Sequence, residues 1–299
     1  LPIGFVLFAN LRDQGYLLGK TLGLLLVAYP PWLAASLKII PFGRASILLS
    51  MAIVAVVSAV ILYRRQHQML AWLRDHRWLV LASEALFTLA FLVFVGIRIL
   101  NPDLWQPWSG GEKPMEFAFL GAIARSTYFP PYDPFFAGGY INYYYYGQYI
   151  CAMLIRLVGV MPSIGFNLVI PLLFALTVAN AFSITYNLVA ALRKQPHTTE
   201  PSSANGFLAS HGSLLAWALA GALFVAVIGN LSTIGEVFKG PWNRGQTTIK
   251  SSIPGLSAVA RVLDGTRKGL QPGQRLFESF NYWNPSRVIP ETINEFPYW

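Results

Sequence analysis

The chain alternates between long apolar stretches and shorter polar ones. A helix needs about 20 predominantly apolar residues to cross a bilayer, and six stretches of this sequence have that character. They are Thr21–Leu37, Ala45–Tyr63, Trp78–Ile97, Tyr140–Val160, Ile164–Leu192 and Gly212–Gly235. We therefore predict an all-α fold, a polytopic integral membrane protein in which five or six of these stretches span the bilayer.

Glu84 and Arg156 are charged residues inside two of these apolar stretches. A charge at membrane depth is costly, so it marks either a buried partner or a function such as a transport pathway. Arg98 stands near the end of its stretch, where a long side chain can reach the interface. For Glu84 the sequence leaves both interpretations open.

The polar segments divide the chain into four parts. Residues 1–100 contain the first membrane helices, and residues 101–147 form a long loop rich in acidic and aromatic side chains. Further membrane helices follow in residues 148–235, interrupted by a polar linker at 193–211, and residues 236–299 form a second long loop.

The distribution of arginines predicts an orientation. The segment Arg64–Arg77 contains four Arg and one Asp, and segments of that kind stay in the cytoplasm. The next helix then places Asn101–Gly147 at the outer face of the cell (plasma) membrane. If the last three apolar stretches all cross, everything after Glu236 is cytoplasmic. Arg193 and Lys194 favour the opposite arrangement, in which one of the three is re-entrant or interfacial.

Composition supports a membrane protein and argues against other classes. Charged residues make up 12% of the chain, whereas soluble domains contain about 25%. Cytoplasmic basic loops explain the net charge of +9, and we expect no nucleic-acid partner because no basic arm or zinc-finger spacing is present. The single cysteine, Cys151, excludes an internal disulfide. The apolar start and abrupt end predict a piece of a longer protein.

The loop at 101–147 contains the side chains best suited to chemistry. Its carboxylates are Asp103, Glu112, Glu116 and Asp133, and its cations are Lys113 and Arg125. A carboxylate can act as a general base, and a cation can stabilise a phosphate. The structural alternative is that acids and Pro114 decorate the first turn of a helix. Asp133, within PPYDP, is typical of a turn.

Two aromatic patterns follow in the same loop. Phe117, Leu120, Ile123 and Ala124 share one face of a helix, which predicts a short interfacial helix on the membrane surface. The tyrosines that come next are Tyr140, Tyr143, Tyr144, Tyr145 and Tyr146. Consecutive residues on a helix point in directions about 100° apart, so some of these rings anchor at the interface and others face protein or a ligand.

Three segments together resemble the uncharacterised "YYY" membrane-protein family, named after a tyrosine run such as Tyr143–Tyr146. They are RDQGYLLGKTLGLLLVAYPPWLAASL near the start, GGEKPMEFAFLGAIARSTYFPPYDPFFAGGYINYYYYGQYI in the centre and SRVIPETINEFPYW at the end. That family looks related to the GT-C glycosyltransferases of the protein-mannosyltransferase type. In those enzymes an acidic residue precedes an amphipathic helix, a PP or GG turn and an aromatic helix, an order that is similar here.

The resemblance implies a GT-C-like helical bundle that transfers a sugar from a polyprenyl-phosphate donor at the outer membrane face. It implies Glu116 or Glu112 as the base and Asp103 as a helper or metal ligand. Lys113, Arg125 and the tyrosines would bind the substrate, and either a divalent metal or these cations would offset the phosphate charge. The competing hypothesis is a non-enzymatic membrane protein, either a transporter or a structural or assembly component.

Overall fold

The computed structural model describes residues 1–100, 102, 104, 112–193, 204–228, 232–247 and 255–271. For residue 112 and for residues 204–211, 227–228 and 232–237 it describes the backbone alone. The described chain divides into two compact units, Leu1–Ala226 and Val227–Trp299. Each unit is treated separately below.

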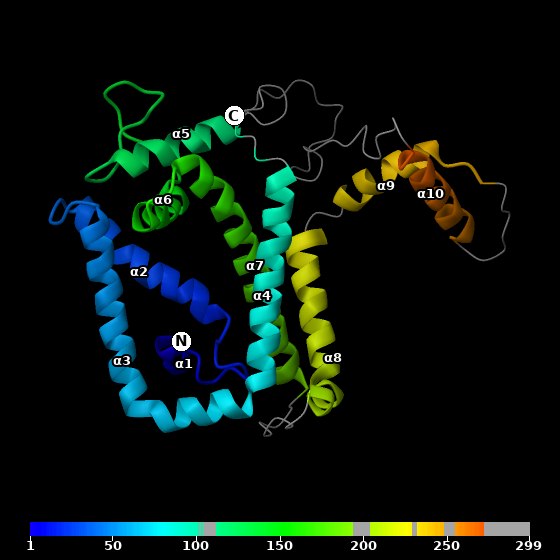
Figure 1. The fold of residues 1–299 in the computed structure, drawn as a ribbon, viewed down its shortest axis with the longest axis horizontal. Coiled ribbons are helices and arrows are strands. Elements are labelled where there is room, and N and C mark those ends of the chain that lie inside the picture. Colours follow the sequence, from blue (N-terminus) through cyan, green and yellow to red (C-terminus); the bar gives the residue numbers. More distant parts are fainter. Residues whose placement is uncertain are drawn as a thin grey trace. The chain divides into compact units, whose positions relative to one another are not determined.

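The regular structure of the described residues is helical, apart from one isolated antiparallel bridge between Tyr132 and Tyr140. The helices of the first unit, shown in Figure 1, are α1 (Pro2–Leu7), α2 (Leu18–Ser36), α3 (Arg44–Asp75), α4 (Arg77–Leu100), α5 (Glu112–Arg125), α6 (Tyr146–Val158), α7 (Pro162–Leu192) and α8 (Ala204–Leu223), which ends in a π-helical turn, η1 (Phe224–Ile228). The predicted all-α fold is confirmed.

Four of these helices, α2, α3, α4 and α7, are long and apolar enough to cross a membrane. They match four of the six predicted stretches, so the chain is a polytopic membrane protein. The prediction for Tyr140–Val160 was wrong in length, because α6 has only 13 residues and a crossing needs about 20. Helix α6 starts late because the tyrosines before Tyr146 belong to a loop. The stretch at 212–235 is helical as far as Ile228, and its apolar part, Gly212–Ala226, is short.

The arginine-rich segment predicted as a loop is mostly helical. Helix α3 bends at Arg65, whose φ and ψ are non-helical, and then continues to Asp75. In Figure 1 the second half of α3 runs across the end of the bundle toward α4. Met69 and Trp72 on this half are buried against Phe5 of α1, whereas its arginines are exposed. The second half of α3 therefore packs its buried apolar side chains on α1 and leaves its arginines exposed.

Apolar side chains form two larger clusters within the first unit. One cluster joins α4, α7 and α8, with Ala179, Phe182 and Tyr186 of α7 near its centre. The other joins α2, the start of α3, α5, α6 and the start of α7, around Leu120, Ile123 and Tyr149. The second cluster supports the loop that follows α5, which is where the candidate site lies.

Two helices of the second unit are described, α9 (Ser232–Arg244) and α10 (Leu256–Gly269). The sequence predicted a long loop here, and these helices replace part of it. The backbones of α9 and α10 pack closely, because a side chain at Gly265 would collide with the Pro241 carbonyl of α9. The final segment predicted within this part, 272–299, lies outside the described residues.

Candidate functional site

A tight β-like turn follows α5 and is held by its own backbone. Tyr132 and Tyr140 face each other across an antiparallel bridge, and their rings stack at 4.9 Å between centroids. At the tip, the Asp133 carboxylate accepts a hydrogen bond from the Phe135 N–H at 2.8 Å. Gly138 has φ of +79°, which a residue with a side chain adopts only with strain. Asp133 is thus a turn residue, as the sequence predicted.

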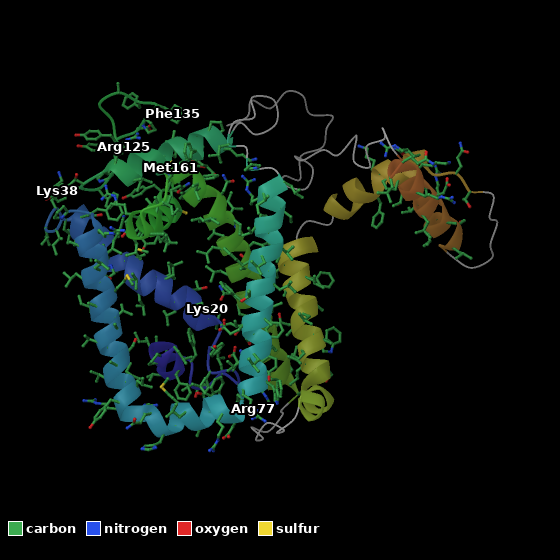
Figure 2. The ribbon with its side chains drawn as sticks, viewed as in Figure 1. Lys20, Lys38, Arg77, Arg125, Phe135 and Met161 are labelled. Carbon is green, nitrogen blue, oxygen red and sulfur yellow. The ribbon has the colours of Figure 1, made fainter. Side chains whose placement is uncertain are left out.

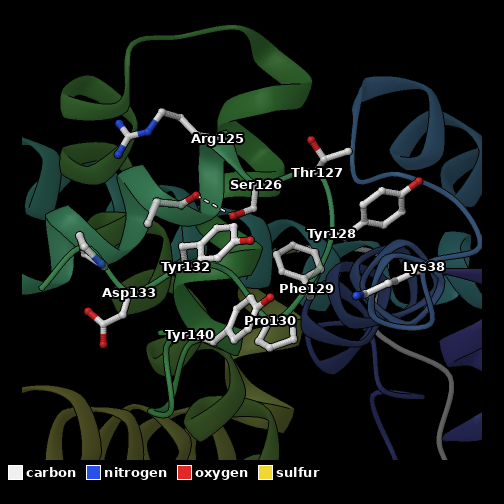
Figure 3. Close-up of a pocket in the computed structure, with 12 residues that line it drawn as sticks. Lys38, Arg125, Ser126, Thr127, Tyr128, Phe129, Pro130, Tyr132, Asp133 and Tyr140 are labelled. Atoms are coloured by element: carbon white, nitrogen blue, oxygen red, sulfur yellow. Dashed lines mark hydrogen bonds between the residues drawn. The ribbon is translucent and has the colours of Figure 1, made fainter. Parts of the chain in front are cut away.

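A cavity of about 640 Å³ lies beside this turn (Figure 3). Lys38, just after α2, and Arg125, the last residue of α5, supply its cations. The rest of the wall comes from the segment between Ser126 and Tyr140, including Tyr128, Tyr132 and Tyr140. In Figure 3 the ends of Lys38 and Arg125 lie on opposite sides of the aromatic rings. The cavity is therefore walled by aromatic rings with a positive charge at either side.

The electrostatics of the cavity favour an anionic group with an apolar or sugar-like body. Two cations and one carboxylate, Asp133, line the cavity. One oxygen of that carboxylate already accepts the hydrogen bond from the Phe135 N–H. The Arg125 guanidinium lies over Gly121, one turn earlier on α5. The Tyr132 hydroxyl donates a hydrogen bond to Tyr140, which raises the pKa of the Tyr132 phenol above its usual value of 10.0. At neutral pH the Tyr132 phenol is therefore an uncharged hydrogen-bonding group.

Arg156 on α6 binds three backbone carbonyls next to the cavity. Its guanidinium donates to the Ala124 carbonyl at 2.8 Å, to the Ser126 carbonyl at 3.0 Å and to the Phe42 carbonyl. It also lies 4.4 Å from the centre of the Phe42 ring. Three different nitrogens of the planar guanidinium bond the three carbonyls, whereas the three donors of a lysine ammonium all start from one nitrogen. Arg156 thus holds the end of α5 to the start of α3.

Of the predicted catalytic carboxylates, Glu116 is the one whose side chain the structure describes, and it does not line the cavity. Glu116 lies on α5 one turn before the buried Leu120. Burial, and to a smaller extent the charge of Glu116, raises the pKa of the Cys151 thiol on α6. Lys113 does not line the cavity either. The backbone of Glu112 begins α5, as expected for an acid in a first helical turn, but its side chain is not described. Asp103 lies outside the described residues.

The tyrosine run splits into an exposed and a packed pair. The prediction that these residues share a helix was wrong, because α6 begins only at Tyr146. Tyr143 and Tyr144 are exposed, 58% and 85% respectively. Tyr145 accepts a hydrogen bond from Trp32 Nε1 at 3.3 Å, and Tyr146 packs edge-on against the same Trp32. Two of the four rings therefore join α6 to α2, and Tyr140 alone of the predicted tyrosines lines the cavity.

Sequence reasoning missed Lys38 and Tyr128, and it named Arg156 without finding its contacts. Lys38 follows an apolar helix and is brought to the cavity by the turn between α2 and α3. Nothing in a single sequence indicates that this turn meets the loop after α5. Arg156 had a signal, an arginine inside an apolar stretch, but its carbonyl partners are 30 and more residues away.

A second polar region lies within the helix bundle. Lys20 of α2 and Glu84 of α4 form an ion pair at 2.9 Å, with their side chains 28% and 40% exposed. Burial and a hydrogen bond to Glu84 raise the pKa of Tyr16 to about 12. Lys20 also lies 4.8 Å from the centre of the Phe87 ring. Glu84 thus has a cationic partner, which explains how its charge is accommodated.

The loop before α2 is fastened to α7 by a buried network. Asn187 Oδ1 accepts from the backbone N–H groups of Arg12, at 2.7 Å, and Asp13, at 3.2 Å. In return Asn187 Nδ2 donates to Asp13 Oδ1 at 2.7 Å, and the Ser183 hydroxyl donates to Asp13 Oδ2 at 2.5 Å. We call these four residues the Asp13 latch.

Across the residues whose side chains are described, no group of three or more His, Cys, Asp or Glu side chains is placed to hold a metal ion. The basic side chains that line the cavity are Lys38 and Arg125. These two residues are the ones to test for phosphate binding.

The fold and the apolar helices define the class of this protein, an all-α polytopic membrane protein. Residues 26–299 match the model of a family described as uncharacterized membrane protein (DUF2298), and the chain belongs to that family. No match was found among curated proteins or among solved structures. What the protein does has therefore to be inferred from the site itself.

Proposed function

We propose that this protein is a GT-C-like glycosyltransferase of the cell membrane, and that its cavity binds the phosphate-linked sugar of a polyprenyl-phosphate donor. The observation that carries the proposal is the cavity of about 640 Å³, with Lys38 and Arg125 beside Tyr128, Tyr132 and Tyr140. Ammonium and guanidinium groups bind phosphate oxygens with charge-assisted hydrogen bonds. Aromatic faces and phenol hydroxyls offer a sugar ring both an apolar surface and hydrogen bonds.

The position of the cavity supports this substrate. Figure 2 shows Lys38, Arg125 and Arg77 on one view, with Arg77 at the opposite end of the bundle from the other two. If the arginine-rich end is cytoplasmic, the cavity opens at the outer face. There the chain of a lipid donor would remain in the bilayer while its phosphate reached Lys38 or Arg125.

The proposed reaction needs a base as well as a phosphate site. Glu116 and Glu112 remain our candidates from the order of the motif; Glu116 stands nine residues before Arg125 on α5, about 13 Å along the helix axis, so the acceptor would have to lie between Glu116 and the cavity. The acceptor oxygen would form a bond to the anomeric carbon of the sugar as the base takes its proton, and the donor phosphate would leave with the electrons of the broken glycosidic bond. A cation beside that phosphate stabilises the charge that develops.

Binding and transfer should be measured separately in the full-length protein with a polyprenyl-phosphate sugar. We expect Arg125→Gln and Lys38→Gln each to weaken donor binding about 10-fold or more, since one charge-assisted contact contributes about 1.5–3 kcal/mol. Arg64→Gln, an exposed arginine at the opposite end, is the matched control and should bind normally. Unchanged binding by both cavity variants would refute the phosphate site.

The base is tested by transfer under saturating donor. Glu116→Gln and Glu112→Gln keep the size of each side chain and remove its ability to accept a proton, so one of them should lower the rate about 100-fold or more. Full activity in both variants would remove them as bases. Binding without transfer in the unmodified protein would instead favour a non-enzymatic receptor for the same lipid.

The transport hypothesis is less well supported by these contacts. It was motivated by Glu84 and Arg156, but Glu84 is paired with Lys20 and Arg156 is bonded to three backbone carbonyls. Both charges have structural partners. A non-enzymatic role, if any, is therefore better sought at the cavity than along a path through these residues.

The orientation can be tested through the single cysteine. After Cys151→Ala, a Tyr144→Cys variant presents a thiol at an exposed position of the loop after α5. We expect a membrane-impermeant maleimide added to intact cells to label it, and an Arg64→Cys variant to stay unlabelled until the cells are opened. The reverse pattern would place the cavity in the cytoplasm and exclude an outer-face transferase.

A further inference from the structure

Close backbone contacts join the described parts of α9 and α10, the two helices of the hairpin in Figure 1. A side chain at Gly265 would collide with Pro241, and one at Gly245 would collide with the Arg261 carbonyl. The Arg261 guanidinium adds hydrogen bonds to the Trp242 and Gly245 carbonyls. The described part of this unit therefore holds two helices together without a hydrophobic core of its own.

The apolar side chains of α10 instead form an exposed stripe. Leu256, Val259, Leu263 and Leu270 are between 42% and 71% exposed. Their spacing of three, four and seven residues places them on one face of a helix. Gly265 and Gly269, which are buried, fall on the opposite face. We call these four residues the α10 stripe.

The described part of this unit is basic, and Arg267 lies beside the stripe. The described segments 232–247 and 255–271 contain five basic residues and two acidic ones, a net charge of +3 (5 − 2). They are Lys239, Arg244, Arg261, Arg267 and Lys268, against Glu236 and Asp264. Arg267 is exposed next to the stripe, and Lys268 forms an ion pair with Asp264 at 2.8 Å. A surface that is apolar along one line and basic beside it matches a bilayer with anionic headgroups.

The hairpin follows an apolar helix directly in the sequence. Only residues 229–231 separate the end of η1 at Ile228 from the start of α9 at Ser232. The helix before them is apolar over Gly212–Ala226.

We propose that α10 lies in the membrane–water interface, with the α10 stripe facing the acyl chains and the neighbouring basic side chains at anionic lipid headgroups. This assigns the second unit a partner, an anionic bilayer surface, independently of any catalytic role for the cavity. An amphipathic helix of this kind lies parallel to the membrane, with its apolar face about 5–10 Å below the headgroups. The hairpin would thus be a peripheral part of the same membrane protein.

The proposal can be tested with spin labels in the full chain. In a Cys151→Ala background, single cysteines at Leu263 and Ser257 place nitroxides on the stripe and on an exposed position outside it. Each variant is reconstituted in nanodiscs of phosphatidylcholine with or without phosphatidylglycerol. We expect the label at 263 to be relaxed more by oxygen than by a water-soluble nickel chelate, and the label at 257 to show the reverse.

One charge-reversal control and two alternative accessibility patterns show whether lipid, protein or water covers the stripe. Arg267→Glu with Lys268→Glu should raise the nickel accessibility at 263 at least about twofold in the anionic nanodiscs, because the added acids repel the headgroups. A label at 263 that is reached by neither reagent would mean that protein covers the stripe, and one reached mainly by nickel would mean water. Either result would overturn the proposal. If Leu263→Cys does not fold, Val259→Cys reports on the same stripe one turn earlier.

Discussion

Replacing Asn187 by Ala should be among the most destabilising single changes in this protein. It removes the acceptor used by the N–H groups of Arg12 and Asp13 and the donor to the Asp13 carboxylate, all buried. Each buried donor left without a partner costs about 1–3 kcal/mol, and a hydrogen bond to a charged group contributes a similar amount. We therefore expect a loss of about 4 kcal/mol.

Reversible unfolding in mixed micelles with increasing SDS measures this loss directly. The midpoint temperature of thermal unfolding should fall by roughly 8–16 °C, since 1 kcal/mol corresponds to about 2–4 °C for a domain of 150–250 residues. Thr177→Val is the matched control, because the Thr177 hydroxyl bonds only the Leu173 carbonyl of its own helix. It should change stability by less than about 1 kcal/mol.

A reversed pair adds a stricter test of the Asp13 latch. Asp13→Asn combined with Asn187→Asp exchanges the carboxylate and the amide while keeping one of each. The carboxylate introduced at position 187 could still accept from the two backbone N–H groups, so the double variant should be more stable than either single variant. A loss below about 1 kcal/mol for Asn187→Ala, or additive effects in the double variant, would refute the assignment of the network.

Three further changes test other contacts. Glu84→Gln should destabilise the bundle by about 1–2 kcal/mol in SDS unfolding, and removing both charges with Lys20→Met should restore part of that loss, because it leaves no unpaired cation; a further loss in the double variant would contradict the pairing. Arg156→Lys should make the segment after α5 more sensitive to protease than Arg44→Lys does, since the donors of an ammonium all start from one nitrogen and would not reach three separate carbonyls. Equal cleavage of the two variants would contradict the role of Arg156 in holding this segment. The Gln246 N–H lowers the pKa of Asp264 below its usual 3.8. The Gln246 N–H should therefore be protected from deuterium exchange at neutral pH. Its protection factor, which compares the exchange rate with the intrinsic rate at the same pH, should fall as Asp264 becomes protonated at pH values below 3.8, and Asp264→Asn should remove this pH dependence.

The sequence predicted the membrane helices well because their signal is local. An uncharged run such as Ala45–Tyr63 identifies a spanning helix whatever its neighbours are. It predicted less well where two elements share a run, as at Tyr140–Val160, because tyrosines satisfy a hydropathy pattern both in a loop and in a helix. Asp133 was predicted correctly as a turn residue since its partner, the Phe135 N–H, is two residues away.

The candidate site was predicted only in part because its walls come from distant segments. Arg125 and Tyr140 were named from the loop that contains them, and both line the cavity. Lys38 was not, since it reaches the cavity through the packing of α2 against α3 and α6. The two main candidates for the catalytic base, Glu112 and Glu116, were chosen because the order of sequence features around them resembles that of the GT-C glycosyltransferases. Their role stays a prediction.

The Asp13 latch also constrains how the protein is made. Asp13 and Asn187 are 174 residues apart, and synthesis proceeds at about 5–20 residues per second. Asp13 therefore emerges roughly 10–35 s before its partner on α7 exists. During that interval its carboxylate has to stay in water, because an unpartnered charge in hydrocarbon is costly. The segment Phe8–Leu17 must then wait at the membrane surface, and α7 completes the N-terminal part of the bundle only after its own insertion.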